Sequence, residues 1–204
     1  MKLLLASNGG FLFDKGYEIL GIPRSEMHIG YVTTASKAVP NLDYITRHKQ
    51  AMKEQGYSYE EIDIEGKSEE ELRSFFKDKN IIHMEGGNTL YLLRAVKKTG
   101  FDKILKDLIN NGIIYVGTSA GSSIMGPVID FSSWITKDTP KEDLIALNYV
   151  PFVFKAHYTD DKETEYKEKT NKVGYPVKFF RDGQGILVED GKYTFVGDGE
   201  EVKI

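Results

Sequence analysis

Short apolar runs alternate with amphipathic segments along most of this chain, and this alternation restricts its fold more than any other feature. The runs contain consecutive apolar residues, as expected for parallel strands that are covered on both faces. We therefore predict strands over five segments: Lys2–Ala6, His28–Thr33, Ser58–Ile64, Asn80–Met84 and Ile113–Gly117.

The segments between these strands predict helices. Apolar residues recur at helical spacing in Leu42–Gln55, Thr89–Lys97 and Asp102–Asn110, and Ser68-Glu69-Glu70-Glu71 is a capping box that begins a further helix. A strand–helix order of this kind predicts one α/β domain over residues 1–204, with a doubly wound, mostly parallel sheet between two helical layers. In such sheets, ligands bind beyond the carboxyl ends of the strands.

The last third of the chain has a different pattern. Val150–His157 predicts a strand, and the highly charged segment Asp160–Lys172 predicts a helix. Gln184–Val188 and Lys192–Val196 flank Glu189-Asp190-Gly191, which predicts a β-hairpin.

Composition excludes several classes of function. The net charge of −4 argues against a nucleic-acid-binding surface. The absence of cysteine excludes disulfides, thiolate metal sites and cysteine nucleophiles, and no histidine pair has metal-ligand spacing, so we expect neither a metal nor a cofactor. The apolar run at the N-terminus is too short for a signal peptide and no segment has the length of a membrane span, so we expect a cytoplasmic protein that does not bind membranes.

The segment Gly117-Thr118-Ser119-Ala120-Gly121 directly follows a predicted buried strand and precedes small residues compatible with a helix. This is the pattern of a nucleophile elbow, in which a serine lies on a sharp turn between strand and helix. The glycines on either side are needed because side chains there would clash in so tight a turn. The pattern predicts that Ser119 is a nucleophile.

A serine hydroxyl needs a base within hydrogen-bond reach, and the chain has four histidines. His28 begins a predicted strand and is expected to be structural, while His48 lies between basic residues on a helix and is expected to be solvated. His157 follows a predicted strand, which would place it at the sheet edge that also carries Ser119. We therefore predict His157 as the base, with His83 as the second choice.

The carboxylate that orients the base remains open between two residues. Asp138 lies in a loop between Ser119 and His157 in the sequence, and Glu189 lies after both. Because triads are defined by geometry and not by chain order, the residues themselves do not decide between them.

Two backbone N–H groups are expected to stabilise an oxyanion. One belongs to Ala120, the residue after the nucleophile, and the other to the Gly86-Gly87 pair, with Gly87 the preferred donor. Asn88 and Thr89 can cap the helix that follows. We expect Asn88, Thr89 and Tyr158, which neighbour these groups in the sequence, to contact the substrate.

Three motifs in this order resemble the dipeptidase E family of serine peptidases and the related cyanophycinases. They are Glu-Gly-Gly-Asn-Thr at 85–89, Gly-Thr-Ser-Ala-Gly-Ser at 117–122 and Ala-His-Tyr at 156–158. The resemblance extends over nearly the whole chain. It implies a flavodoxin-like, class I glutamine amidotransferase-like α/β sandwich, with Ser119 as nucleophile, His157 as base and a backbone donor in the loop at Gly87. For the acid it offers both Asp138 and Glu189, of which we favour Glu189 because a strand end fixes a carboxylate better than a loop.

One departure from this family concerns specificity. The aspartate-specific dipeptidases carry an arginine after the catalytic histidine, whereas residues 160–167 of this chain contain none. Lysine lacks the bidentate fork that clamps a carboxylate. We expect a serine peptidase that hydrolyses short peptides as a monomer or homodimer. The alternatives are a catalytically silent binding protein on the same scaffold and an esterase or amidase acting on non-peptide substrates.

Overall fold

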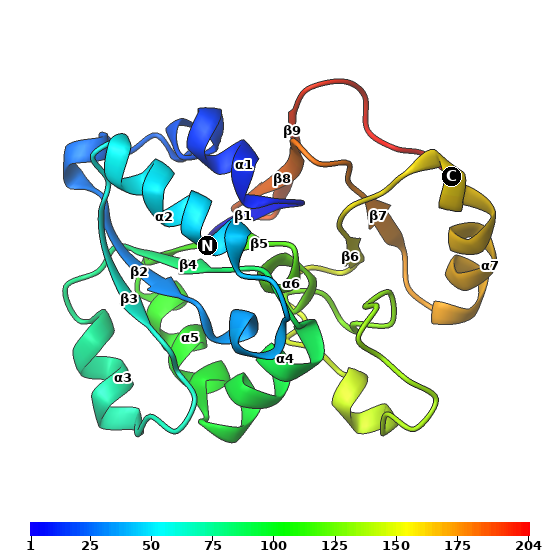
Figure 1. Ribbon diagram of the computed structural model, residues 1–204, viewed down its shortest axis with the longest axis horizontal. Helices are drawn as coiled ribbons and strands as arrows, with labels where there is room; N and C mark the ends of the chain where they lie inside the picture. The colour runs from blue at the N-terminus through cyan, green and yellow to red at the C-terminus, as the bar shows by residue number, and fades with distance from the viewer.

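The computed structural model describes residues 1–204, except for the side chains of residues 14 and 15. Its main feature is a seven-stranded sheet in the order β3-β2-β4-β5-β1-β8-β9 (Figure 1). The first five strands in this order are parallel, and β8 and β9 are antiparallel to their neighbours. The strands are β1 (Lys2–Ala6), β2 (His28–Val32), β3 (Ser58–Ile62), β4 (Ile81–Met84), β5 (Ile114–Thr118), β8 (Gln184–Glu189) and β9 (Lys192–Gly197).

Helices cover both faces of this sheet, which explains its consecutive apolar residues. Leu3 and Leu5 of β1 pack with α3, α4 and α5 on one face, while Leu4 and Ala6 pack with α1, α2 and the π-helical turn Leu12–Gly16 on the other. The helices are α1 (Gly9–Phe11), α2 (Asp43–Glu54), α3 (Glu69–Phe76), α4 (Thr89–Lys98), α5 (Phe101–Asn110), α6 (Ala120–Ser123) and α7 (Glu163–Val173).

The predicted elements of the first half are confirmed with small shifts in their ends. The capping box of α3 is present, because Ser68 accepts from the Glu71 N–H and Glu71 accepts from the Ser68 N–H. The hairpin between β8 and β9 is also present, with Asp190 and Gly191 both at positive φ in its two-residue turn. The longest helix, α2, has 12 residues, so no helix in the described chain has the length and apolar character needed to cross a membrane.

The strand predicted at Val150–His157 is the largest departure in the fold. Only β6 (Val153–Lys155) is extended, and it pairs with β7 (Val177–Phe179) in a separate two-stranded parallel sheet instead of joining the main one. With α7 this small sheet forms its own apolar cluster, built from Phe131, Val153, Tyr158, Tyr166 and Phe179. Figure 1 shows β6, β7 and α7 to the side of the main sheet. His157 therefore approaches Ser119 from a neighbouring substructure and not from the same sheet.

Candidate active site

Ser119 lies in a sharp turn between β5 and the four-residue helix α6. Its backbone has φ 48° and ψ −100°, a conformation that a residue with a side chain rarely adopts. Both flanking glycines are required by close contacts: a Cβ at Gly117 would lie 2.7 Å from the Gly121 carbonyl carbon, and one at Gly121 would lie 2.1 Å from the Met84 oxygen. The turn therefore presents the Ser119 side chain beyond the carboxyl end of β5.

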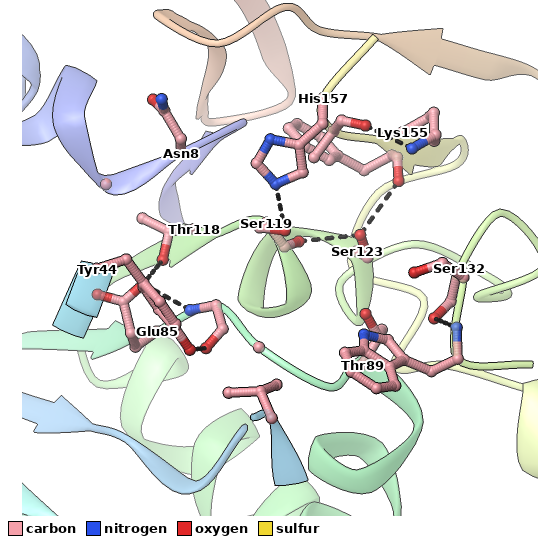
Figure 2. A pocket seen from close by; sticks show the side chains of 18 of the residues that line it. Asn8, Tyr44, Glu85, Thr89, Thr118, Ser119, Ser123, Ser132, Lys155 and His157 are labelled. Carbon is pink, nitrogen blue, oxygen red and sulfur yellow. Dashed lines mark hydrogen bonds between the residues drawn. The ribbon is translucent and has the colours of Figure 1, made fainter. Parts of the chain in front are cut away.

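His157 and Asp182 complete a chain of hydrogen bonds that starts at Ser119. His157 Nε2 is 2.9 Å from Ser119 Oγ, and His157 Nδ1 is 2.6 Å from Asp182 Oδ1 (the contact with Ser119 is drawn in Figure 2). The hydrogen bond from His157 lowers the pKa of Asp182 below its ordinary value, so this carboxylate is ionised and accepts the proton on Nδ1. In the neutral imidazole, Nε2 is then free to accept the Ser119 hydroxyl proton.

Hydrogen bonds connect the loop that carries His157 to the residues that directly follow β1 and β7. The His157 N–H donates to Ser7 Oγ (2.8 Å), and the Ser7 hydroxyl lies within reach of the Phe180 carbonyl (3.1 Å) and of Asp182 Oδ1 (3.2 Å). His157 itself has φ 55°, so the histidine and the serine both have unusual backbone conformations. Such conformations persist only where the surroundings hold them, and they are common at functional sites.

The structure does not bring either predicted acid to His157. Glu189 ends β8, which runs antiparallel to β1, and it pairs with Lys2 at the opposite end of the sheet from Ser119 (2.9 Å between Lys2 Nζ and Glu189 Oε1). Asp138 is exposed in a turn and does not line the cavity around Ser119. Glu189 was favoured because a strand end holds a carboxylate in a fixed position, but β8 runs antiparallel to β1, so its beginning and not its end lies beside Ala6 and the site.

Asp182, which the sequence analysis missed, lies in the turn that leads into β8. Its only local signal is an Asp-Gly pair between two short strands, Arg181-Asp182-Gly183-Gln184, and such pairs are common in ordinary turns. Asp182 is one of 31 acidic residues, so this signal could not have singled it out.

The two predicted oxyanion donors, Gly87 and Ala120, have free N–H groups. Within the described part of the chain, neither N–H donates to a protein acceptor. Gly87 has φ 142°, and a Cβ there would lie 2.4 Å from the Ala35 oxygen, so only glycine fits without a shift. The Asn88 N–H donates to this same Ala35 oxygen (3.0 Å), which fixes the loop on its outer side.

The three predicted substrate contacts have different outcomes. Thr89 lines the cavity. The Asn88 side chain accepts from the Tyr91 N–H (2.9 Å) and so caps α4, as the sequence allowed, instead of lining the cavity. Tyr158 is buried among Phe131, Tyr166 and Phe179, outside the lining of the cavity, because the chain turns at His157 toward the small sheet.

Ser119 and His157 lie in a cavity of about 440 Å³, the size of a small-molecule site. Figure 2 shows Tyr44 of α2 on one wall of this cavity, and Lys155 of β6 and Ser132 on the opposite wall. Gly86, Gly87, Phe131 and Trp134 also line the cavity. Each wall carries a cation. Arg47 on α2 has no acidic partner in the described chain, and Lys155 on β6 donates to the Ala156 carbonyl (2.6 Å). Burial and the charges of two nearby lysines lower the pKa of Lys155 to about 8.

A buried carboxylate, Glu85, lies at the base of this cavity beside Thr118. Burial by itself raises the pKa of Glu85, but the hydrogen bond from His48, the neighbouring imidazoles and the hydrogen bond from Thr118 lower it to about 2. His48, expected to be solvated, instead packs over Gly9 and binds Glu85 (2.8 Å). His83, the second choice for the base, is a buried core histidine: it binds the Tyr17 hydroxyl (2.7 Å), and burial lowers its pKa to about 4.

No group of three or more His, Cys, Asp or Glu side chains within the described residues is placed to hold a metal ion. The site itself offers a serine, a histidine and a carboxylate in series, with two free backbone N–H groups nearby.

Comparison with known proteins agrees with this geometry. The profile of Peptidase family S51 matches residues 3–202. A Pasteurella multocida protein named uncharacterized peptidase PM1590 is 30% identical over 195 residues, covering 93% of this chain and 94% of that protein. Peptidase E of a Nostoc species is 28% identical over 221 residues, covering 97% of this chain and 86% of the relative.

Solved structures share the fold. A Listeria monocytogenes protein assigned provisionally as a peptidase E superposes with a TM-score of 0.80 at 24% identity, over 97% of this chain and 98% of that one. A peptidase from an acI-B1 Actinobacterium superposes with a TM-score of 0.73 at 14% identity, over 97% and 87% of the two chains. The flavodoxin-like α/β fold expected from the sequence is thus confirmed. With the match over residues 3–202, the chain belongs to Peptidase family S51 and is a serine peptidase.

Proposed function

We propose that this peptidase hydrolyses short peptides, dipeptides above all, through a triad of Ser119, His157 and Asp182. The observation that carries the proposal is the continuous hydrogen-bonded series from Ser119 Oγ through the imidazole to the Asp182 carboxylate, inside a cavity of substrate size. Asp182 replaces both acids that the sequence suggested.

In the proposed reaction, Ser119 Oγ attacks the scissile carbonyl carbon while His157 Nε2 takes the hydroxyl proton. The N–H groups of Gly87 and Ala120 bind the oxyanion of the tetrahedral intermediate, since both are free to donate. His157 then gives its proton to the departing amine, which leaves an acyl-enzyme. Water, activated by the same imidazole, hydrolyses this ester and restores Ser119. Asp182 keeps the imidazole in the required tautomer and stabilises its positive charge.

The cavity walls support a short substrate with a free carboxylate. Arg47 and Lys155 offer positive charge on opposite sides of the cavity, from α2 and β6, even though no arginine follows His157. A dipeptide carries a carboxylate at one end, close to the bond that is cut, whereas an internal bond of a protein does not. The aromatic residues Tyr44, Phe131 and Trp134 also line the cavity and can pack against side chains of the substrate.

Hydrolysis of a dipeptide panel, with simple esters and amides alongside, tests this function. Wild-type protein is expected to cleave dipeptides, and Ser119→Ala is expected to lose about a thousandfold or more in kcat. Ser74→Ala, which removes an exposed serine on α3, is the matched control and should retain full activity. Unchanged hydrolysis by folded Ser119→Ala would refute the mechanism, and turnover of esters without dipeptides would assign the site to non-peptide substrates.

A further inference from the structure

The buried carboxylate of Glu85 holds together two parts of the proposed active site. Its Oε1 accepts from the Gly86 N–H (2.6 Å) and from the Thr118 hydroxyl (2.5 Å). Gly86 begins the loop that carries the Gly87 N–H, and Thr118 directly precedes Ser119. One carboxylate oxygen therefore bridges the oxyanion loop and the strand of the nucleophile (the Glu85 side chain is labelled in Figure 2).

This bridge lies where the backbone ladder between β4 and β5 ends. The last pair in that ladder is Met84 with Gly117. Glu85 and Thr118 are the next residues on each strand, so their side-chain contact continues the connection beyond the ladder. Ser119 and Gly87 come directly after this contact, where their atoms must be placed within a fraction of an ångström of the reacting carbonyl.

The other oxygen of Glu85 keeps this carboxylate ionised and fixed. Oε2 accepts from His48 Nδ1 (2.8 Å) and from the Tyr31 hydroxyl, and His83 Nε2 lies 4.0 Å away. Each oxygen of Glu85 accepts from two protein donors. The side chain is 1% exposed, so the carboxylate relies on these donors and not on bulk water. A buried carboxylate with four donors is both rigid and strongly anionic.

The hydrogen bond to Glu85 also determines which loop N–H is available. Gly86 and Asn88 each donate inside the protein, to Glu85 and Ala35, whereas Gly87 between them does not. The loop thus presents one free donor, held on one side by the Glu85 carboxylate and on the other by the Ala35 carbonyl.

From this arrangement we propose that Glu85 is a positioning residue for catalysis: through Oε1 it sets the Gly87 N–H relative to Ser119. This inference rests on the proposed function, because it concerns the oxyanion donor of that same reaction. It differs from a purely structural role in one respect. Loss of the bridge should reduce transition-state stabilisation even in variants that stay folded and bind substrate normally.

The test uses Glu85→Gln and Thr118→Val, which remove the charge and the bridging hydroxyl with little change in shape, and Thr118→Ser, which keeps the hydroxyl. Lys79→Met is the matched control, because Lys79 is also buried and ion-paired but lies at the opposite end of β4, where it binds Glu60 (2.8 Å). For each variant, kcat and KM are measured on the dipeptide that wild-type protein cleaves fastest. The rate of covalent labelling by an alkyl fluorophosphonate and the melting temperature are measured in parallel.

The labelling reaction has the same geometric needs as peptide hydrolysis. Ser119 Oγ forms a bond to phosphorus, the P–F bond breaks to release fluoride, and His157 accepts the hydroxyl proton, while the phosphoryl oxygen takes the place of the oxyanion. Labelling therefore reports on nucleophile and donor together and does not depend on knowing the natural substrate.

We expect Glu85→Gln and Thr118→Val to lower kcat and the labelling rate by about 10- to 100-fold, less than complete loss of an oxyanion donor, with KM changed by less than about threefold. Thr118→Ser should stay within about threefold of wild type, and Lys79→Met should lower the melting temperature without lowering kcat.

Wild-type kcat and labelling in folded Glu85→Gln and Thr118→Val would overturn the inference, as would equal losses in Thr118→Ser and Thr118→Val. If Glu85→Gln does not fold, the two Thr118 variants decide. Failure of the proposed function has a different signature, namely a wild-type protein that fluorophosphonate does not label at Ser119, whatever happens at Glu85.

Discussion

Replacing Asp182 by asparagine separates the triad seen in the structure from the two that the sequence suggested. Asparagine keeps the size of the side chain and can occupy the same place between His157 and Ser7. It removes the negative charge and places an amide where a carboxylate accepted the Nδ1 proton. The proton can then move to Nε2, which is the wrong tautomer for accepting the Ser119 hydroxyl.

The size of the effect follows from the charge and exposure of this pair. When His157 takes the serine proton, it becomes an imidazolium 2.6 Å from the carboxylate oxygen. The side chains are 50% and 59% exposed, so the effective dielectric constant lies between that of a protein surface and that of water. At charge separations near 4 Å, this attraction is about 1–4 kcal/mol, or roughly 5- to 1,000-fold in rate. With the tautomer effect added, we expect kcat to fall by about a thousandfold.

The assay compares kcat for dipeptide hydrolysis and the fluorophosphonate labelling rate in Asp182→Asn, Glu189→Gln and Asp138→Asn. The last two variants change the acids favoured by the sequence and are expected to stay within about twofold of wild type, since neither reaches His157. A folded Asp182→Asn with more than about a tenth of wild-type kcat would refute the triad, because the wrong tautomer by itself costs far more than tenfold. A large loss in Glu189→Gln or Asp138→Asn would return the role to that residue.

Two further predictions concern the loop and the buried acid. Gly87→Ala should lower the free energy of unfolding by about 1–3 kcal/mol and should also lower kcat, because its Cβ would lie 2.4 Å from the Ala35 oxygen. Gly66→Ala is the control, because Gly66 is also at positive φ but has open space around it, and it should lower stability only. Thermal melts and steady-state kinetics measure the two effects. Because the pKa of Glu85 is lowered from 4.5 to about 2, its stabilisation is present above pH 4.5 and is lost as pH falls toward 2. Other carboxylates with lowered pKa values, such as Glu71 and Asp182, lose stabilisation over the same range, so the test is the difference between the two proteins. Urea unfolding should show a loss that is roughly 3 kcal/mol larger in wild type than in Glu85→Gln; equal losses would contradict this assignment.

Much of the fold was predictable because its signals are local. The consecutive apolar residues of β1 and β5, the capping box at Ser68 and the Asp-Gly turn after Glu189 are each signals of a few residues, so each element could be identified without knowing its distant contacts. The Ser119 turn is equally local, since Gly117 and Gly121 are required by neighbouring backbone atoms.

The choice of acid was not predictable in this way. Asp182 and His157 are 25 residues apart and come into contact because the segment after β6 lies beside the turn before β8. The antiparallel direction of β8 places Glu189 at the opposite end of the strands from the site. β6 likewise belongs to a separate small sheet because it packs with β7 and α7. No local pattern in Val150–His157 predicts this packing. The contact between His48 and Glu85 also depends on tertiary packing. The sequence around His48 is typical of a solvated helix face, and only the position of α2 over the end of β4 brings His48 to Glu85.

The amino-acid sequence by itself determined the α/β fold, the serine in its strained turn and the glycine loop opposite, since short-range sterics and hydrophobic periodicity specify each of them. The sequence also indicated His157 as the base, but its approach to Ser119 from the small sheet depends on tertiary packing. Only the tertiary structure decided which carboxylate orients His157, which cations face the cavity and how Glu85 joins two strand ends. Those relations depend on strand direction and on contacts between residues far apart in the chain, and neither is encoded in any short stretch of sequence.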